Sequence, residues 1–273
     1  MQYARITRKC LLFVFTAASS AVAQTAPEQP DALDLLKSVE LTYGAIINTT
    51  AMNGSDAQSK ANVEQSVTVT ADSTGKFRME STDVMGMVAV YDGNTMWRYM
   101  PAANAYWKLP LNGASRSAEA RASGMSGGAN PLQEYKNITR GVKGAKILGS
   151  EKVHASDTDA DCWVVSLEYG PLGSEASAPT QAAGFAFSDF AHTETLWVDK
   201  NCYLVYREDS TTKMTMPNTN TPINMTQTSR VETFTVNEPV SPDVFTFTPP
   251  PGAREIDESK FLRKTAEVPQ KKN

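Results

Sequence analysis

Lys76-Phe77-Arg78-Met79-Glu80 alternates charged and apolar side chains at every position. Successive side chains of a β-strand point to opposite faces, so this period of two predicts a half-buried strand. Phe77 and Met79 are expected on one face, and the three charged side chains on the other. The stretch therefore predicts a sheet that has one apolar face.

The same pattern recurs on both sides of this stretch. Residues 87–91 and 95–100 flank Asp92-Gly93-Asn94, which is typical of a hairpin turn. In the second run, Trp97 and Tyr99 are expected on one face and Arg98 on the other. About eleven strands are predicted in all, and the remaining eight are 63–70, 106–109, 145–153, 162–169, 193–198, 203–208, 225–234 and 244–248.

Helical patterns are few. Asp31 can cap a helix that runs to about Tyr43, and Asn130 can cap a short one that begins at Pro131. Residues 112–130 hold at most a short helix around 116–122, and residues 49–60 look turn-like. Strands without regular intervening helices favour a mainly β (α+β) fold, with a largely antiparallel sheet covered on one face by helices. Such a sheet, if strongly curved, can enclose a cavity.

The first 23 residues have the organisation of a secretory signal peptide. A basic front, a short apolar run and a small-residue cleavage site follow one another, namely Arg5, Arg8 and Lys9, then residues 11–18, then Ala21-Val22-Ala23. Cleavage after Ala23 would leave one domain at 24–258 and a basic, polar tail at 259–273. No other run approaches the ~18 apolar residues of a membrane span, so the exported chain is expected to be soluble.

The composition excludes several functions. The chain carries a formal net charge of −4, and loss of the leader would make it more negative, which disfavours nucleic acid as a partner. No phosphate loop, zinc motif, calcium loop or nucleophile elbow occurs in the sequence. We therefore predict no cofactor, no metal site and no catalytic residue. The two histidines, His154 and His192, leave a hydrolase with an unrecognised site as an alternative.

Two cysteines follow the predicted cleavage site, Cys162 and Cys202. In an exported protein such a pair can form a disulfide, provided that the Cα atoms lie about 4.4–6.8 Å apart. Two buried thiols are the alternative, and the sequence does not choose between them.

Three motifs, in order along the chain, resemble the periplasmic outer-membrane lipoprotein carriers, the LolA-like family. Residues 75–80 are similar to the family's Gly-Lys-Phe-Arg-Trp strand, with Met79 in the place of the tryptophan. Residues 91–101 are similar to its Asp-Gly-x-Thr-x-Trp-x-Tyr-x-Pro hairpin. Residues 245–253 are similar to its closing Phe-x-Phe-x-Pro-Pro-x-Gly segment. The resemblance covers most of residues 31–258.

This resemblance implies a strongly curved antiparallel half-barrel of about eleven strands, closed by an N-terminal helix and short central helices. The protein would be a soluble, monomeric carrier in the periplasm that holds the acyl chains of lipidated proteins and brings them to the outer membrane. An inner-membrane release complex and an outer-membrane receptor would be its partners. A regulator of the same fold that senses lipids or lipoproteins is the alternative.

The apolar side chains opposite the charges are the expected lining of an acyl-chain site, unless they simply pack as core. They are Phe77, Met79, Trp97, Tyr99, Trp163, Val165 and Leu167. Methionine favours the first interpretation, because its flexible thioether adapts to irregular apolar surfaces.

Overall fold

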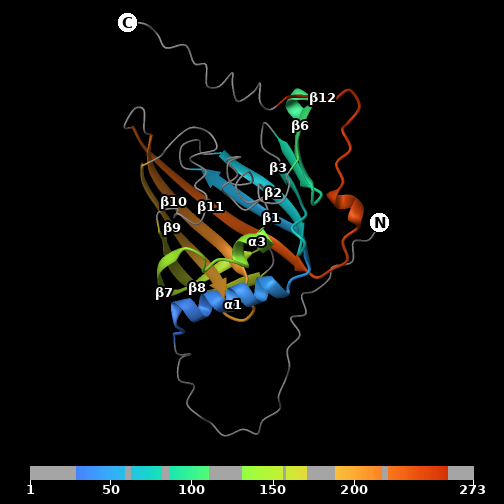
Figure 1. Ribbon diagram of the computed structural model, residues 1–273. Coiled ribbons are helices and arrows are strands. Elements are labelled where there is room, and N and C mark those ends of the chain that lie inside the picture. The colour runs from blue at the N-terminus through green and yellow to red at the C-terminus, as the bar shows by residue number, and fades with distance from the viewer. Residues whose placement is uncertain are drawn as a thin grey trace, which may run out of the picture.

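One sheet dominates the protein (Figure 1). The structure is a computed structural model that describes residues 29–58, 63–81, 86–110, 131–155, 158–170, 188–216 and 221–257. Its elements are α1 (Ala32–Ala45), β1 (Asn48–Gln58), β2 (Val63–Asp72), β3 (Phe77–Ser81), β4 (Met87–Tyr91), β5 (Thr95–Met100), η1 (Pro101–Ala103), β6 (Ala105–Pro110), α3 (Pro131–Tyr135), β7 (Val142–Ala155), β8 (Thr158–Tyr169), β9 (Ser188–Asp199), β10 (Val205–Met216), β11 (Thr221–Val236), η3 (Pro242–Phe245) and β12 (Arg254–Glu255).

The strand order is β12-β6-β5-β4-β3-β2-β1-β11-β10-β9-β8-β7. Two antiparallel meanders, β1 to β6 and β7 to β11, are therefore joined at a single seam where β1 pairs with β11. The short β12 adds a parallel strand beside β6. The sheet is open, with β7 and β12 at its edges, and it has twelve strands rather than about eleven. Closure into a half-barrel by helices is not confirmed.

Ten of the eleven predicted strands are confirmed, and two predictions are wrong. Residues 244–248 are not a strand, because η3 turns the chain at Pro242 and extended backbone follows. Residues 49–58 are not a turn, because they form most of β1, and residues 59–60 lie outside the described residues. The Asn, Gly and Asp of β1 have low strand propensity. Backbone pairing with β2 on one side and β11 on the other overrides that propensity.

Helix α1 begins where the sequence predicts. The Asp31 carboxylate accepts hydrogen bonds from the backbone N–H groups of Leu33 and Asp34, at 2.8 and 3.2 Å, which satisfies two of the orphan donors at the helix start. One stripe of the helix is buried, and it contains Ala32, Leu35, Leu36, Val39 and Tyr43. The sheet curves around α3, and α1 runs along its lower rim (Figure 1).

The main core lies between this stripe and one face of the sheet. Both meanders contribute to it: Val69, Phe77 and Met79 come from the first, and Leu167 and Leu196 from the second. Because α1 packs against side chains of both halves, the helix holds together the two meanders that the β1–β11 seam joins.

The phenol of Tyr43 ties the end of α1 to the sheet. Its hydroxyl accepts a hydrogen bond from the backbone N–H of Val205 at 3.1 Å, and its ring packs against those of Tyr135 and Phe234. We expect Tyr43→Phe to lower the free energy of unfolding by about 1–3 kcal/mol, because a buried N–H loses its acceptor while the ring contacts remain. Urea denaturation of the two proteins measures the difference. A change below about 0.5 kcal/mol would contradict the expectation.

Among the described residues, no helix is long and apolar enough to cross a membrane. The predicted leader at residues 1–23, the short helix around 116–122 and the tail at 259–273 lie outside the described residues.

Candidate functional site

The helix-bearing face of the sheet is the candidate site. Four of the seven side chains predicted to line an acyl-chain site lie in the core cluster on this face, and a fifth packs against it. Phe77 and Met79 are 4% and 8% exposed, and Val165 and Leu167 are fully buried. Trp163 is half-buried and packs against the same cluster, with the Lys200 ammonium 4.5 Å from its ring centroid.

Trp97 and Tyr99 lie on the opposite face, so the prediction that they share a face with Phe77 and Met79 is wrong. Phe77 is paired with Tyr91 across β3 and β4, and Tyr91 is paired with Met96 across β4 and β5. Paired residues share a face of the sheet. Met96, and with it Arg98, therefore turns toward the core.

The charge of Arg98 predicted a side chain in water, but this side chain is buried. Its side chain is only 9% exposed, and its guanidinium lies 5.9 Å from the ring centroid of Trp107. Trp97 and Tyr99 instead face a segment that follows β11. Phe247 stacks on Trp97 with ring centroids 5.5 Å apart, and it also contacts Tyr99 at 6.0 Å.

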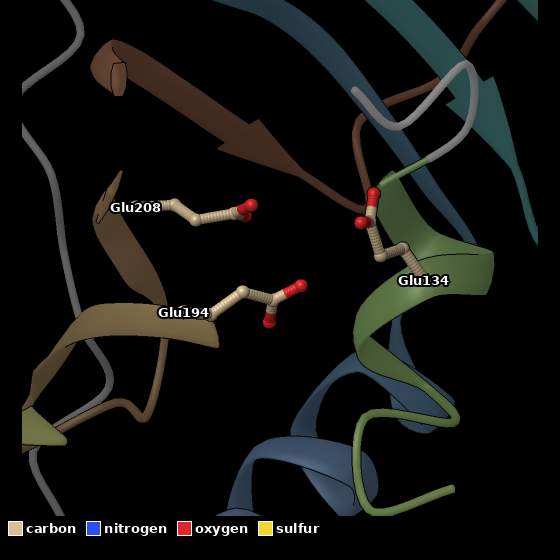
Figure 2. Close-up of side chains that lie close together, drawn as sticks. All are labelled: Glu134, Glu194 and Glu208. Atoms are coloured by element: carbon tan, nitrogen blue, oxygen red, sulfur yellow. The ribbon is translucent and has the colours of Figure 1, made fainter. Parts of the chain in front are cut away.

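A polar zone adjoins the apolar core on the candidate face. Glu194 of β9 and Glu208 of β10 approach Glu134 of α3, and one carboxylate oxygen from each lies within 4.8 Å of the others. Figure 2 shows the three side chains pointing toward one centre from the short helix and two strands. Three elements that are distant in sequence thus place three carboxylates together.

Phenol and imidazole groups surround these carboxylates. The Tyr135 hydroxyl donates to Glu208 at 2.7 Å, and the Tyr169 hydroxyl donates to Glu194 at 2.8 Å. His192 lies 2.7 Å from Glu194 through Nε2 and 2.9 Å from the Thr212 hydroxyl through Nδ1. Burial raises the pKa of both tyrosines, and the neighbouring carboxylates raise it further. Both phenols therefore remain hydrogen-bond donors at neutral pH.

Within the described residues, these three glutamates form a group of carboxylates close enough together to offer oxygen ligands to one hard cation. Three oxygens are at most half of the six to eight that Ca²⁺ takes, so the cluster alone does not define a metal centre. Sequence reasoning missed it because no spacing motif links residues 134, 194 and 208. The one local hint is His192-x-Glu194, which places both side chains on one face of a strand.

The two histidines have different surroundings. His154 lies at the β7–β8 hairpin, where its Nδ1 is 3.0 Å from Asp159 and its side chain is 77% exposed. His192 belongs to the polar zone described above. The contact of His154 is with a carboxylate, and His192 contacts the Thr212 hydroxyl and the Glu194 carboxylate.

Cys162 and Cys202 are both free thiols in this structure, and a disulfide between them was one of the two alternatives that the sequence leaves open. Cys162 is buried on the convex face, in a second cluster with Val164, Trp197 and Tyr206. Cys202 is half-buried in the turn after β9, where its N–H donates to the Asp199 carboxylate at 2.9 Å.

The two thiols should differ in reactivity. Burial raises the pKa of Cys162 to about 12, so only about 10⁻⁴ of it is thiolate at pH 8. In the protein cleaved after Ala23, which lacks Cys10, we expect one equivalent of a thiol reagent to react with the native form, at Cys202, and a second only after denaturation. Peptide mapping of the labelled protein identifies the site. Labelling of Cys162 in the native protein at the rate of Cys202 would contradict this.

The fold and site define a mainly β protein built on one open sheet, with a helix-covered apolar face. The chain belongs to the family described as "Predicted periplasmic protein (DUF2092)", whose model matches residues 31–258. This description confirms the predicted location in the periplasm. No functionally curated protein matches the chain.

Several solved structures are similar to the chain at low identity. An uncharacterised conserved protein from Thermus thermophilus is 13% identical, with a TM-score of 0.46, and the match covers 83% of this chain and 99% of that one. A LolA superfamily protein from Nitrosomonas europaea is 13% identical, with a TM-score of 0.35 and coverage of 80% and 99%. In the Pseudomonas aeruginosa MucA/MucB complex the match is 9% identical, with a TM-score of 0.41 and coverage of 80% and 62%. A LolA superfamily protein is thus among the structures to which this chain is similar, and similarity at this level carries no information on function.

Proposed function

We propose that this protein binds lipidated proteins in the periplasm and holds their acyl chains on the helix-bearing face of its sheet, without catalysis. One observation supports the proposal most. The apolar cluster beneath α1 is continuous across both meanders and contains methionines, Met79 and Met96, beside aromatic side chains. Flexible thioethers can repack around a chain that enters such a cluster.

In the proposed mechanism, α1 moves to admit the acyl chain. The helix contributes one buried stripe, and its solvent side carries Leu33 and Leu41 at 48% and 75% exposure. An acyl chain that replaced this stripe would gain about 0.8 kcal/mol for each buried CH₂ group. Release would follow when α1 packs back onto the sheet. Phe77, Met79, Val165 and Leu167 would then contact the chain, and Trp97 and Tyr99 would not.

The direct test is to purify the protein from its own periplasm and identify what accompanies it. Mass spectrometry of the native protein should detect lipoproteins or lipids in stoichiometric amounts, and a fluorescent fatty-acid probe should bind the delipidated protein. If neither is found, and the probe also fails to bind over a range of temperatures at which the protein is folded, the acyl-binding proposal is wrong.

A further inference from the structure

The chain is acidic overall, but one continuous stretch within the part that the structure describes is strongly basic. Residues 136–152 contain Lys136, Arg140, Lys143, Lys146 and Lys152 against one acidic residue, Glu151, which is a local net charge of +4 in a chain of net charge −4. The structure describes this whole stretch, and all five basic residues are exposed. Such separation of charge orients a protein in an electric field.

Contacts fix this stretch beside α1. The Thr139 backbone N–H and hydroxyl both donate to the Glu40 carboxylate of α1, at 3.0 and 2.6 Å. The turn that carries Lys136 and Arg140 is thereby attached to the helix. The chain then continues into β7, the edge strand, which lies next to α1 (Figure 1).

Large apolar side chains are exposed among these charges. Leu33 and Leu41 lie on the solvent side of α1, four residues either side of Lys37, and are 48% and 75% exposed. Leu148 is 57% exposed and is the extra residue of a bulge in β7, between Ile147 and Gly149. The acidic side chains of α1 have local partners: Asp31 caps the helix, Asp34 binds Lys37 and Glu40 binds Thr139.

We propose that this basic face, made of the solvent side of α1, the 136–140 turn and the β7 edge, docks on the anionic surface of a phospholipid bilayer. Exposed leucines among basic residues are the combination that binds the headgroup region, where apolar side chains insert and cations contact anionic lipids. An acidic peptide is the less favoured occupant. The face is a convex helix beside a strand edge, and two bulges and several lysines on β7 oppose the addition of a further strand.

The proposal goes beyond acyl-chain binding and does not depend on it. Its test is flotation of the full chain with vesicles of phosphatidylcholine containing about 30 mol % phosphatidylglycerol, compared with pure phosphatidylcholine. We expect binding to the anionic vesicles only, and its loss at about 0.5 M salt because salt screens the attraction. Lys136→Gln/Arg140→Gln/Lys143→Gln, in the turn and at the start of β7, should lower partitioning roughly a hundredfold, at about fivefold for each charge.

The matched control removes three exposed positive charges from other elements, as Lys213→Gln/Arg230→Gln/Arg254→Gln on β10, β11 and β12. It has the same net charge as the first variant and should keep most of the binding. Leu41→Gln should weaken binding severalfold without changing its salt dependence. Equal loss in both triple variants, equal binding to neutral vesicles, or binding to a polyglutamate peptide but not to vesicles would each overturn the proposal. All these variants should bind the fatty-acid probe in solution as well as the original protein does. If the original protein binds no probe, the acyl site is contradicted, but the docking face is not.

Discussion

Met79→Asp should abolish binding of a fluorescent fatty-acid probe, with a decrease in affinity of at least a hundredfold. Met79 is 8% exposed on the helix-bearing face, between Val69 of β2 and Ala89 of β4, and both of these neighbours are apolar and buried. A carboxylate at this position would have Val69 and Ala89 as its cross-strand neighbours, with Arg98 one strand further along the same row, and burying a charge in so apolar a site is costly. The variant should also lose about 3–5 kcal/mol of stability. Probe titration and thermal unfolding are measured on the same samples.

Two control variants separate binding from stability. Met79→Leu keeps the volume and apolar character, so it should retain binding and cost less than ~1.5 kcal/mol. Val164→Asp places the same charge at a position 6% exposed in the convex cluster. It should cost similar stability but keep probe affinity at temperatures where it is folded. If both aspartate variants lose the probe equally, or if folded Met79→Asp binds it normally, the helix-bearing face is not the acyl site.

The second large effect should appear at alkaline pH. Burial raises the pKa of Tyr43, Tyr135 and Tyr169 above the ordinary value of about 10, and Glu208 and Glu194 raise it further for the last two. These phenols ionise in the unfolded chain above pH 10 but resist ionisation in the folded protein. Their stabilising contribution is therefore complete below pH 10 and is lost as pH rises. Each of the three phenols should lower the free energy of unfolding by about 1.4 kcal/mol per pH unit above pH 10. For all three together this is roughly 4 kcal/mol per pH unit.

Urea denaturation at a series of pH values between 9 and 12 measures this slope. Tyr169→Phe should reduce the slope by about a third, because one of the three phenols is removed. Tyr106→Phe is the comparison: desolvation and the hydrogen bond to Glu255 also raise the pKa of its phenol, but the group lies near the surface, so its removal should change the slope less than Tyr169→Phe does. Equal stability at pH 9 and pH 11.5 would show that the three phenols are not held in their neutral form.

The sequence predicted most strands because their pattern is local. Phe77 and Met79 alternate with charges, and an alternating stretch forms a strand whatever its partners are. The two strands that it missed depend on partners. The β1 strand has turn-forming residues and is held by β2 and β11, and β12 is two residues long and is held by β6. The predicted strand at 244–248 failed for the opposite reason, because Phe245 and Phe247 alternate but pack on the outside of the sheet rather than pairing.

The candidate site was only partly predictable. Which face of a strand points to the core depends on its register with the neighbouring strands. The charge of Arg98 predicted the wrong core-facing side for β5. Trp97 and Tyr99 pack on Phe247, which lies outside the sheet. This contact could not be predicted, because Phe247 is distant from both residues in the sequence. The cluster of Glu134, Glu194 and Glu208 could not be predicted, since it exists only where α3 meets β9 and β10.

The seam between β1 and β11 has a consequence for biogenesis. Each meander is made of neighbouring hairpins that can form as soon as their residues are together, whereas the seam joins the first and the eleventh strand. During export, the edge of β1 that pairs with β11 stays unpaired until most of the polypeptide has crossed the membrane. An unpaired strand edge is a template for aggregation. We therefore expect this seam to close late in folding, and a chain truncated before Thr221 would carry β1 without its β11 partner.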